Sequence, residues 1–127
     1  MNLTEAKLKV LILEVWRGMT ITLPLPQGPV DLPIPKGFSK RKGGPDKYNP
    51  GLYDIKLLSH DKQKMMEIAV NLKTGGVSIH TFVREKKSKV MTHVDSKPFP
   101  AGTYDEAILD GYFKMIEELK NEKPHWM

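Results

Sequence analysis

Cysteine is absent from this chain of 127 residues, and its absence excludes several kinds of chemistry at once. There can be no disulfide, no thiolate nucleophile and no zinc site built on cysteine. Long hydrophobic runs are also missing, because the apolar segment at residues 10–13 is far shorter than a membrane span. Glu5 stands where a secretory signal peptide would be basic. We therefore expect a cytoplasmic protein with no membrane association.

Signatures of catalysis are missing too. The lysine-rich stretch at residues 36–47 lacks the GxxxxGK[ST] spacing of a phosphate-binding loop. His93, Asp95 and Ser96 supply the residue types of a hydrolytic triad, but no nucleophile elbow accompanies them. Residues so close on an extended chain seldom converge. The sequence therefore favours a non-enzymatic protein with no catalytic residues and no cofactor.

What the composition offers instead is a modest positive charge. The formal net charge is +5, and the isoelectric point is near 9.4. This balance favours acidic partners such as nucleic acid, although many cytosolic domains share it. A chain of this length is most simply one domain, residues 1–127, with a core of ordinary size.

Alternation of apolar and polar residues predicts four antiparallel strands in the middle of the chain. Successive side chains of a strand point to opposite faces, so the register must keep the apolar set together. Gly75 supplies the positive φ angle of a tight hairpin turn. Extending the register through the last hairpin sets Val83 opposite Val90 and His80 opposite His93. The expected strands cover residues 53–57, 66–72, 77–84 and 89–94.

An amphipathic helix near the C-terminus provides a cover for this sheet. Thr103 and Glu106 have the spacing of a capping box, which marks a helix start. Lys120 suits the C-terminal end of the helix dipole, and Pro124 stops the helix. The apolar stripe of the helix comprises Tyr104, Ile108, Tyr112, Met115, Ile116 and Leu119. The core face of the sheet comprises Tyr53, Ile55, Met66, Ile68, Val70, Ile79, Val83, Val90 and Val94.

The expected fold class is therefore α+β. We predict an antiparallel sheet, made of a four-stranded meander plus an N-terminal β-hairpin, covered on one face by the C-terminal helix. The hairpin joins residues 7–16 to residues 19–23. As an alternative, Thr4 could cap a helix that runs through residues 7–16.

A Pro/Gly-rich basic loop region is expected at about residues 24–50, and two proline-rich tracts overlap it. The tracts, at residues 23–26 and 32–35, should be extended and should lie at an edge or on the surface, because proline cannot sit in mid-sheet. We expect their leucines and isoleucine to close one end of the core. The alternative is a docking site built on the proline motif.

Two clusters of cations are candidates for phosphate contacts. The first lies in a predicted flexible loop at residues 36–47, with Phe38 or Tyr48 as an aromatic neighbour, and its alternative role is solubility. The second lies at the tip of the last hairpin, where its alternative role is to protect the sheet edge. The candidates in the first cluster are Lys40, Arg41 and Lys42. The candidates in the second cluster are Arg84, Lys86, Lys87 and Lys89.

The non-core face of the last hairpin carries rings as well as cations. Phe82, His80 and His93 could stack bases there, while cations neutralise phosphates, as in many sheet-faced single-strand binders. The alternative is that the N-terminal strands or a second subunit cover this face. His80 and His93 could also share a zinc ion, but a third ligand is not evident, so we expect no metal site.

The outline of a four-stranded meander followed by one helix is similar to the PC4-like family of single-stranded-DNA-binding proteins. Tyr53-Asp54-Ile55-Lys56 and the turn after it, residues 59–65, are loosely similar to the second strand and turn of that family. The resemblance covers about a tenth of the chain, and the long proline-rich N-terminal half departs from it. It implies a fold, and fold does not fix function.

The leading hypothesis is a small nucleic-acid-binding protein for single-stranded or structured nucleic acid, acting as a homodimer. The alternative is a protein-binding inhibitor or adaptor, or a module that sequesters a small anionic ligand. This alternative would use the proline-rich segments and an apolar patch of Phe82, Met91 and Trp126. The two hypotheses differ in their expected salt dependence.

Overall fold

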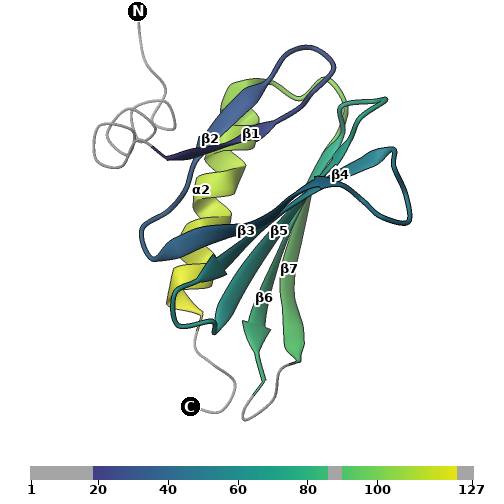
Figure 1. Ribbon diagram of the computed structural model, residues 1–127. Helices are drawn as coiled ribbons and strands as arrows, with labels where there is room; N and C mark the ends of the chain where they lie inside the picture. Colours follow the sequence, from purple (N-terminus) through teal and green to yellow (C-terminus); the bar gives the residue numbers. More distant parts are fainter. Residues whose placement is uncertain (1–18, 86–89, 123–127) are drawn as a thin grey trace, which may run out of the picture.

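The computed structural model describes residues 19–85 and 90–122 (Figure 1). In chain order the strands are β1 (Thr20–Leu23), β2 (Val30–Pro33), β3 (Phe38–Pro45), β4 (Leu52–Ser59), β5 (Lys64–Asn71), β6 (Val77–Arg84) and β7 (Met91–Phe99). They are followed by the helix α2 (Asp105–Asn121). No helix among these residues is long and apolar enough to cross a membrane.

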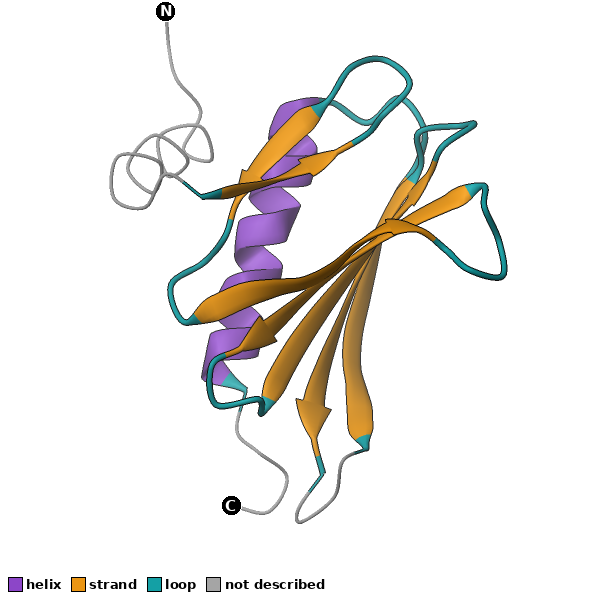
Figure 2. Ribbon diagram, in the orientation of Figure 1, coloured by secondary structure: helices purple, strands orange, loops and turns teal. Residues whose placement is uncertain are grey.

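The main sheet has five antiparallel strands in the order β3-β4-β5-β6-β7, and α2 lies against one of its faces (Figure 2). This confirms the predicted α+β class, an antiparallel sheet covered on one face by a C-terminal helix. The meander has five strands instead of the four predicted, because β3 lies where a flexible basic loop was expected. Its glycines and proline are tolerated since β3 is an edge strand.

The proline-rich tracts belong to a separate two-stranded sheet. Strand β1 pairs with β2, so that Ile21 lies opposite Leu32 and Leu23 opposite Val30. The predicted partner of this strand, residues 7–16, lies outside the described residues. The prediction that the tracts close the core is confirmed. Their buried apolar side chains are Leu23, Leu25, Leu32 and Ile34.

The apolar stripe of α2 joins the hairpin and the main sheet in one core cluster. Tyr112 is fully buried, and its hydroxyl donates a hydrogen bond of 2.7 Å to the carbonyl oxygen of Pro33. Burial raises the pKa of Tyr112, so the hydroxyl keeps the proton that it donates. Lys64 Nζ donates to the carbonyl oxygen of Lys120 at 2.7 Å, which ties the start of β5 to the end of α2.

Two details of the predicted helix are wrong. The N-cap is Tyr104, which makes no side-chain cap hydrogen bond, and the Thr103 hydroxyl donates to the carbonyl oxygen of Pro100 instead. The predicted capping box therefore does not form. Tyr104 was predicted to belong to the apolar stripe, but it is 81% exposed because it lies before the first residue of the helix.

The register of the last hairpin differs from the prediction for two reasons: Arg84 pairs with Met91, so β7 starts two residues later than expected, and β7 then carries a β-bulge. Val83 lies opposite Thr92 rather than Val90, and His80 lies opposite Ser96 rather than His93. Between these pairs the register shifts by one residue, at Val94. Val90 is consequently 63% exposed and does not belong to the core, whereas Val94 is half-buried against it.

Candidate nucleic-acid interface

The face of the main sheet opposite α2 is uncovered by any described element (Figures 1 and 2). We call it the open face. Along β5 and β6 every second side chain points into the core, and the side chains between them lie on the open face. Its central residues are Lys56, Leu58, Met65, Glu67, His80, Phe82, His93 and Ser96.

The pairing register arranges these residues in rows across the strands. One row is apolar and aromatic, and its members are only partly buried except for the exposed His93. The neighbouring row is polar and charged. The apolar row runs through Leu58, Met65, Phe82 and His93. The polar row runs through Lys56, Glu67, His80 and Ser96.

Three predicted ring residues lie together at the β6–β7 side of the open face. Phe82 and His93 have ring centroids 5.5 Å apart at an interplanar angle of 71°, an edge-on contact. His80 and His93 have centroids 5.9 Å apart at 53°. The structure therefore brings His80, Phe82 and His93 into one cluster on an uncovered surface.

Ser96 joins this cluster, contrary to the expectation that such close neighbours do not converge. Its hydroxyl oxygen lies 2.6 Å from His93 Nε2 and 3.0 Å from His80 Nδ1. In a regular strand residues three apart point to opposite faces, but the bulge at Val94 inserts one residue and returns Ser96 to the face of His93. The carboxylate of Asp95 accepts the Ser96 N–H at 2.8 Å.

The two histidines do not complete a metal site with other strong ligands. Within residues 19–85 and 90–122 no group of three or more His, Asp or Glu side chains could hold a metal ion. Ser96 is the third group on the histidine nitrogens, and a serine hydroxyl is a weak metal ligand compared with imidazole or carboxylate.

The predicted cations are divided between different parts of the sheet. Arg84 follows Phe82 on the same face of β6, opposite Met91. On β3, the backbone of Lys42 pairs with that of Lys56, and Arg41 occupies a bulge. Lys40 lies opposite the buried Leu57, so its register assigns it to the α2 side of the edge. The predicted residues Lys86, Lys87 and Lys89 lie outside the described part of the chain.

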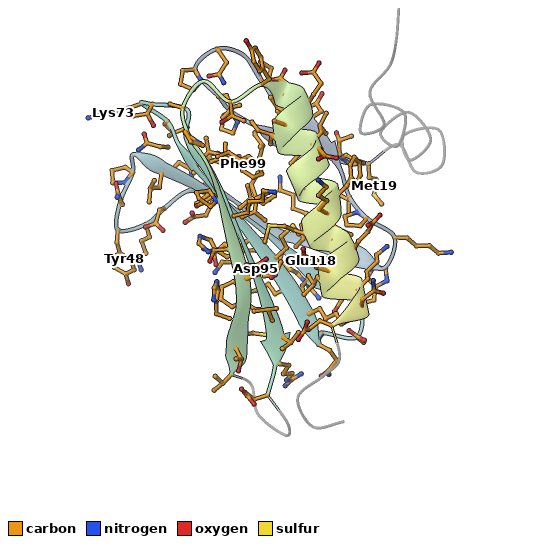
Figure 3. All side chains as sticks on the ribbon, turned by 180° about the vertical axis from the view of Figure 1, so that it is seen from behind. Met19, Tyr48, Lys73, Asp95, Phe99 and Glu118 are labelled. Carbon is orange, nitrogen blue, oxygen red and sulfur yellow. The ribbon has the colours of Figure 1, made fainter. Side chains whose placement is uncertain are left out.

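Of the two aromatic neighbours proposed for the first basic cluster, only one is available to a ligand. Phe38 is buried in the core, whereas Tyr48 is 89% exposed at the tip of the β3–β4 loop. The Lys47 ammonium lies 5.7 Å from the Tyr48 ring centroid. Figure 3 shows Tyr48 on the side of the sheet away from α2, which is the side of the open face.

A pair of carboxyl groups beside this loop was missed by the sequence interpretation. Asp54 is 7% exposed, and its register places it in a row with Gly44 and Ala69. Burial, a hydrogen bond with Asp46, and the charges of Asp46 and Glu67 raise the pKa of Asp54 to about 6. Asp46 also accepts the N–H groups of Tyr48 and Asn49 at 2.8 and 3.0 Å, which holds the loop.

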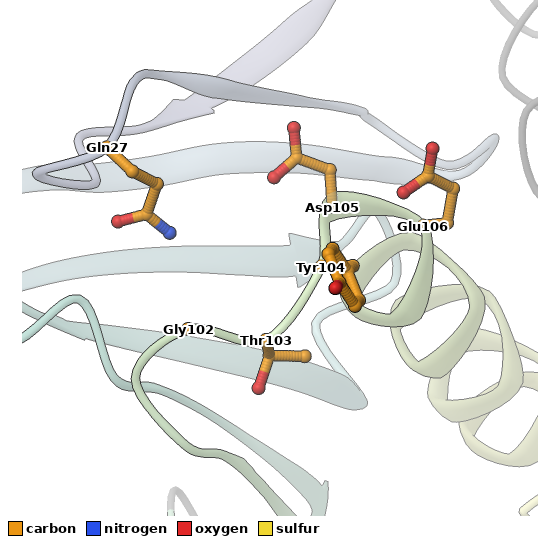
Figure 4. Close-up of a pocket in the computed structure, with 6 residues that line it drawn as sticks. All are labelled: Gln27, Gly102, Thr103, Tyr104, Asp105 and Glu106. Carbon is orange, nitrogen blue, oxygen red and sulfur yellow. The ribbon is translucent and has the colours of Figure 1, made fainter.

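A hollow of about 410 Å³ lies away from this surface, at the start of α2 (Figure 4). Gln27 from the β1–β2 turn forms one side, and residues 102–106 form the other. Two of its lining side chains are the carboxylates of Asp105 and Glu106, which offset the positive end of the helix dipole. The hollow therefore does not suit a phosphate group.

No protein-family model matches the chain, and no curated protein or solved structure is significantly similar to it.

Proposed function

We propose that the protein binds single-stranded nucleic acid on the open face, without covalent chemistry. The supporting observation is the adjacency of Phe82, His80 and His93 on a sheet surface that no described element covers. Exposed rings on a sheet accept unstacked bases, which a single strand offers and a duplex does not. Lys56 and Arg84 on the same face, with Arg41 at its β3 edge, provide positive charge for phosphates.

The charge of the open face predicts moderate rather than tight binding. Glu67 stands in the polar row between Lys56 and His80, and Asp54 lies in the next row. Each phosphate contact lowers the slope of log affinity against log salt by about 0.7 for a single strand. With a few cations partly balanced by acids, we expect a shallow slope of about −2.

The decisive test is titration of a fluorescent oligodeoxythymidylate, followed by anisotropy, with two single-ring variants. Phe82→Ala removes a ring from the open face, and Tyr104→Ala removes an exposed ring at the other end of the molecule. Stacking on an aromatic side chain contributes about 1–3 kcal/mol per base, so Phe82→Ala should weaken binding about tenfold. Tyr104→Ala should leave it unchanged. Equal affinities for the two variants would show that the open face is the wrong surface.

A protein-binding module remains the second candidate because the apolar row itself is uncovered. Leu58, Met65 and Phe82 are partly buried apolar neighbours, and Met91 continues them beyond Arg84. The proline-rich segments give this candidate little support, since the apolar side chains of both tracts face the core. A captured partner whose affinity is insensitive to salt would favour this candidate over nucleic acid.

The homodimer stays a prediction, and the edges of the main sheet limit the surfaces through which it can form. Both edge strands of the main sheet carry a bulge, at Arg41 in β3 and at Val94 in β7. Pro45 and Pro98 also interrupt the donor pattern of these strands. Such features oppose edge-to-edge pairing, so a dimer would have to form through another surface.

A further inference from the structure

Two imidazole nitrogens converge on a single oxygen atom in the open face. His80 Nδ1 reaches Ser96 Oγ from β6 at 3.0 Å, and His93 Nε2 reaches it from β7 at 2.6 Å. A neutral imidazole has one donor nitrogen and one acceptor nitrogen, and a serine hydroxyl has one proton. With both rings neutral, one ring donates to Ser96 Oγ and the other accepts its proton.

Addition of one proton changes this arrangement into a pair of donors. The accepting ring becomes an imidazolium, both rings then present N–H groups to the same point, and the cluster gains a positive charge. Two N–H donors aimed at one position, one of them charged, match an anionic oxygen better than a hydroxyl. His93 and Ser96 are exposed, so a phosphate oxygen can take the position that the two nitrogens share when the Ser96 side chain rotates its hydroxyl away from it.

We propose that His80, His93 and Ser96 form a phosphodiester-binding site whose affinity is switched on by protonation of the histidines. This inference rests on the proposed function, because it assigns the backbone of the same single strand to a position beside Phe82. The Phe82 and His93 rings are in edge-on contact. The surface proposed to stack a base therefore lies next to the group proposed to bind a phosphate. A strand whose base lies on Phe82 thus has its phosphate within reach of the histidine pair.

The charged groups around the cluster explain why protonation is needed. Glu67 on β5 lies opposite His80, and Asp95 adjoins Ser96 on β7. These carboxylates repel a phosphate while both rings are neutral. Positive groups on the open face, namely Lys56 on β4 and Arg84 on β6, offset them in part. The charge gained by the rings on protonation decides the balance.

The effect of Asp54 must be separated from that of the histidines in any test, because acidification also protonates its carboxyl group. The pKa of Asp54 is raised to about 6, so acidification also removes a negative charge near the open face. Asp54→Asn removes this second titration. His60→Gln is the matched histidine control, because His60 is exposed in the β4–β5 turn.

The experiment measures affinity for a fluorescent oligodeoxythymidylate by anisotropy at about pH 8 and about pH 5.5, at constant ionic strength. The affinity of the unaltered protein should be at least about tenfold higher at the lower pH, as expected for a hydrogen bond to a charged group. The double variant His80→Gln, His93→Gln should bind more weakly at both pH values, because it loses two rings of the open face, and it should lose the increase. Asp54→Asn and His60→Gln should retain most of it.

The outcomes distinguish the inference from the proposed function. Binding that is equal at both pH values, or an increase that survives in the double variant, overturns the histidine site and leaves nucleic-acid binding in place. An increase abolished by Asp54→Asn assigns the effect to the carboxyl pair and also overturns it. Absence of binding at either pH rejects the proposed function itself. As a second readout, the imidazole NMR signals of His80 and His93 should shift on addition of inorganic phosphate at the lower pH, whereas His60 should not.

Discussion

The two faces of the main sheet are built from the same strands and have opposite properties. On β6 the buried positions are Val77, Ile79, Thr81 and Val83, while Ser78, His80, Phe82 and Arg84 alternate with them on the open face. The α2 side is closed by the helix, whereas the open face carries half-exposed rings and both signs of charge. The side chains on the α2 side therefore determine the stability of the sheet, and those on the open face can contact a ligand without disturbing the core.

The largest effect is expected from a core substitution on β6. Ile79→Ala removes a side chain that is 0% exposed, and it should lower the free energy of unfolding by about 2–5 kcal/mol. Phe82→Ala, on the open face of the same strand, should lower it by less than about 1.5 kcal/mol. Urea denaturation followed by circular dichroism measures both. Similar losses for the two variants would contradict the division between the faces.

The carboxyl pair provides a smaller effect that depends on pH. The pKa of Asp54 is raised from 3.8 to about 6 in the folded protein, so the folded state holds this proton to a higher pH than the unfolded state does. Its contribution to stability is present below about pH 4 and is lost as pH rises through about 6.

Asp54→Asn should consequently raise the free energy of unfolding at pH 7 by about 1–3 kcal/mol, and the gain should vanish near pH 4. Asp110→Asn is the control, because Asp110 forms an i,i+4 ion pair with Lys114 on the outer surface of α2. It should change stability by less than about 0.5 kcal/mol. Urea denaturation across this pH range would contradict the prediction if Asp54→Asn were neutral throughout.

The smallest of these effects concerns a single hydrogen bond on the core side. Tyr112→Phe keeps the buried ring but removes the hydroxyl that donates to Pro33, so the carbonyl oxygen loses this partner. We expect a loss of about 1–2 kcal/mol in thermal or urea unfolding. Tyr48→Phe removes an exposed hydroxyl and should have no measurable effect. Equal results for the two tyrosines would show that the buried bond contributes nothing net.

The sequence predicted the parts of the fold that depend on local periodicity. Strands β4 to β6 and the stripe of α2 repeat at two and at three to four residues, and this spacing survives whatever else the chain does. Strand β3 was missed because Arg41, Gly43 and Gly44 hide its alternation, and its strand conformation comes from pairing with β4.

The residues of the candidate site also divide into those that local periodicity predicted and those that it did not. His80 and Phe82 were placed on the correct face by parity, since β6 is regular. The contact of His93 with Ser96 was not predictable, because a bulge depends on the partner strand and not on a local motif. Asp54 looked like an ordinary polar position of an alternating strand, and its interaction with Asp46 depends on the loop between them.

The hydrogen bond from Tyr112 to Pro33 joins residues 79 positions apart, and it has a consequence for synthesis of the chain. The hairpin of β1 and β2 is made early, but the helix that shares its core cluster is made only after the strands of both sheets. Until α2 leaves the ribosome, the apolar side chains of Ile21, Leu23 and Leu32 lack that cover. The nascent protein therefore passes through a stage in which these side chains are accessible to chaperones and prone to aggregation, and synthesis of α2 ends that stage.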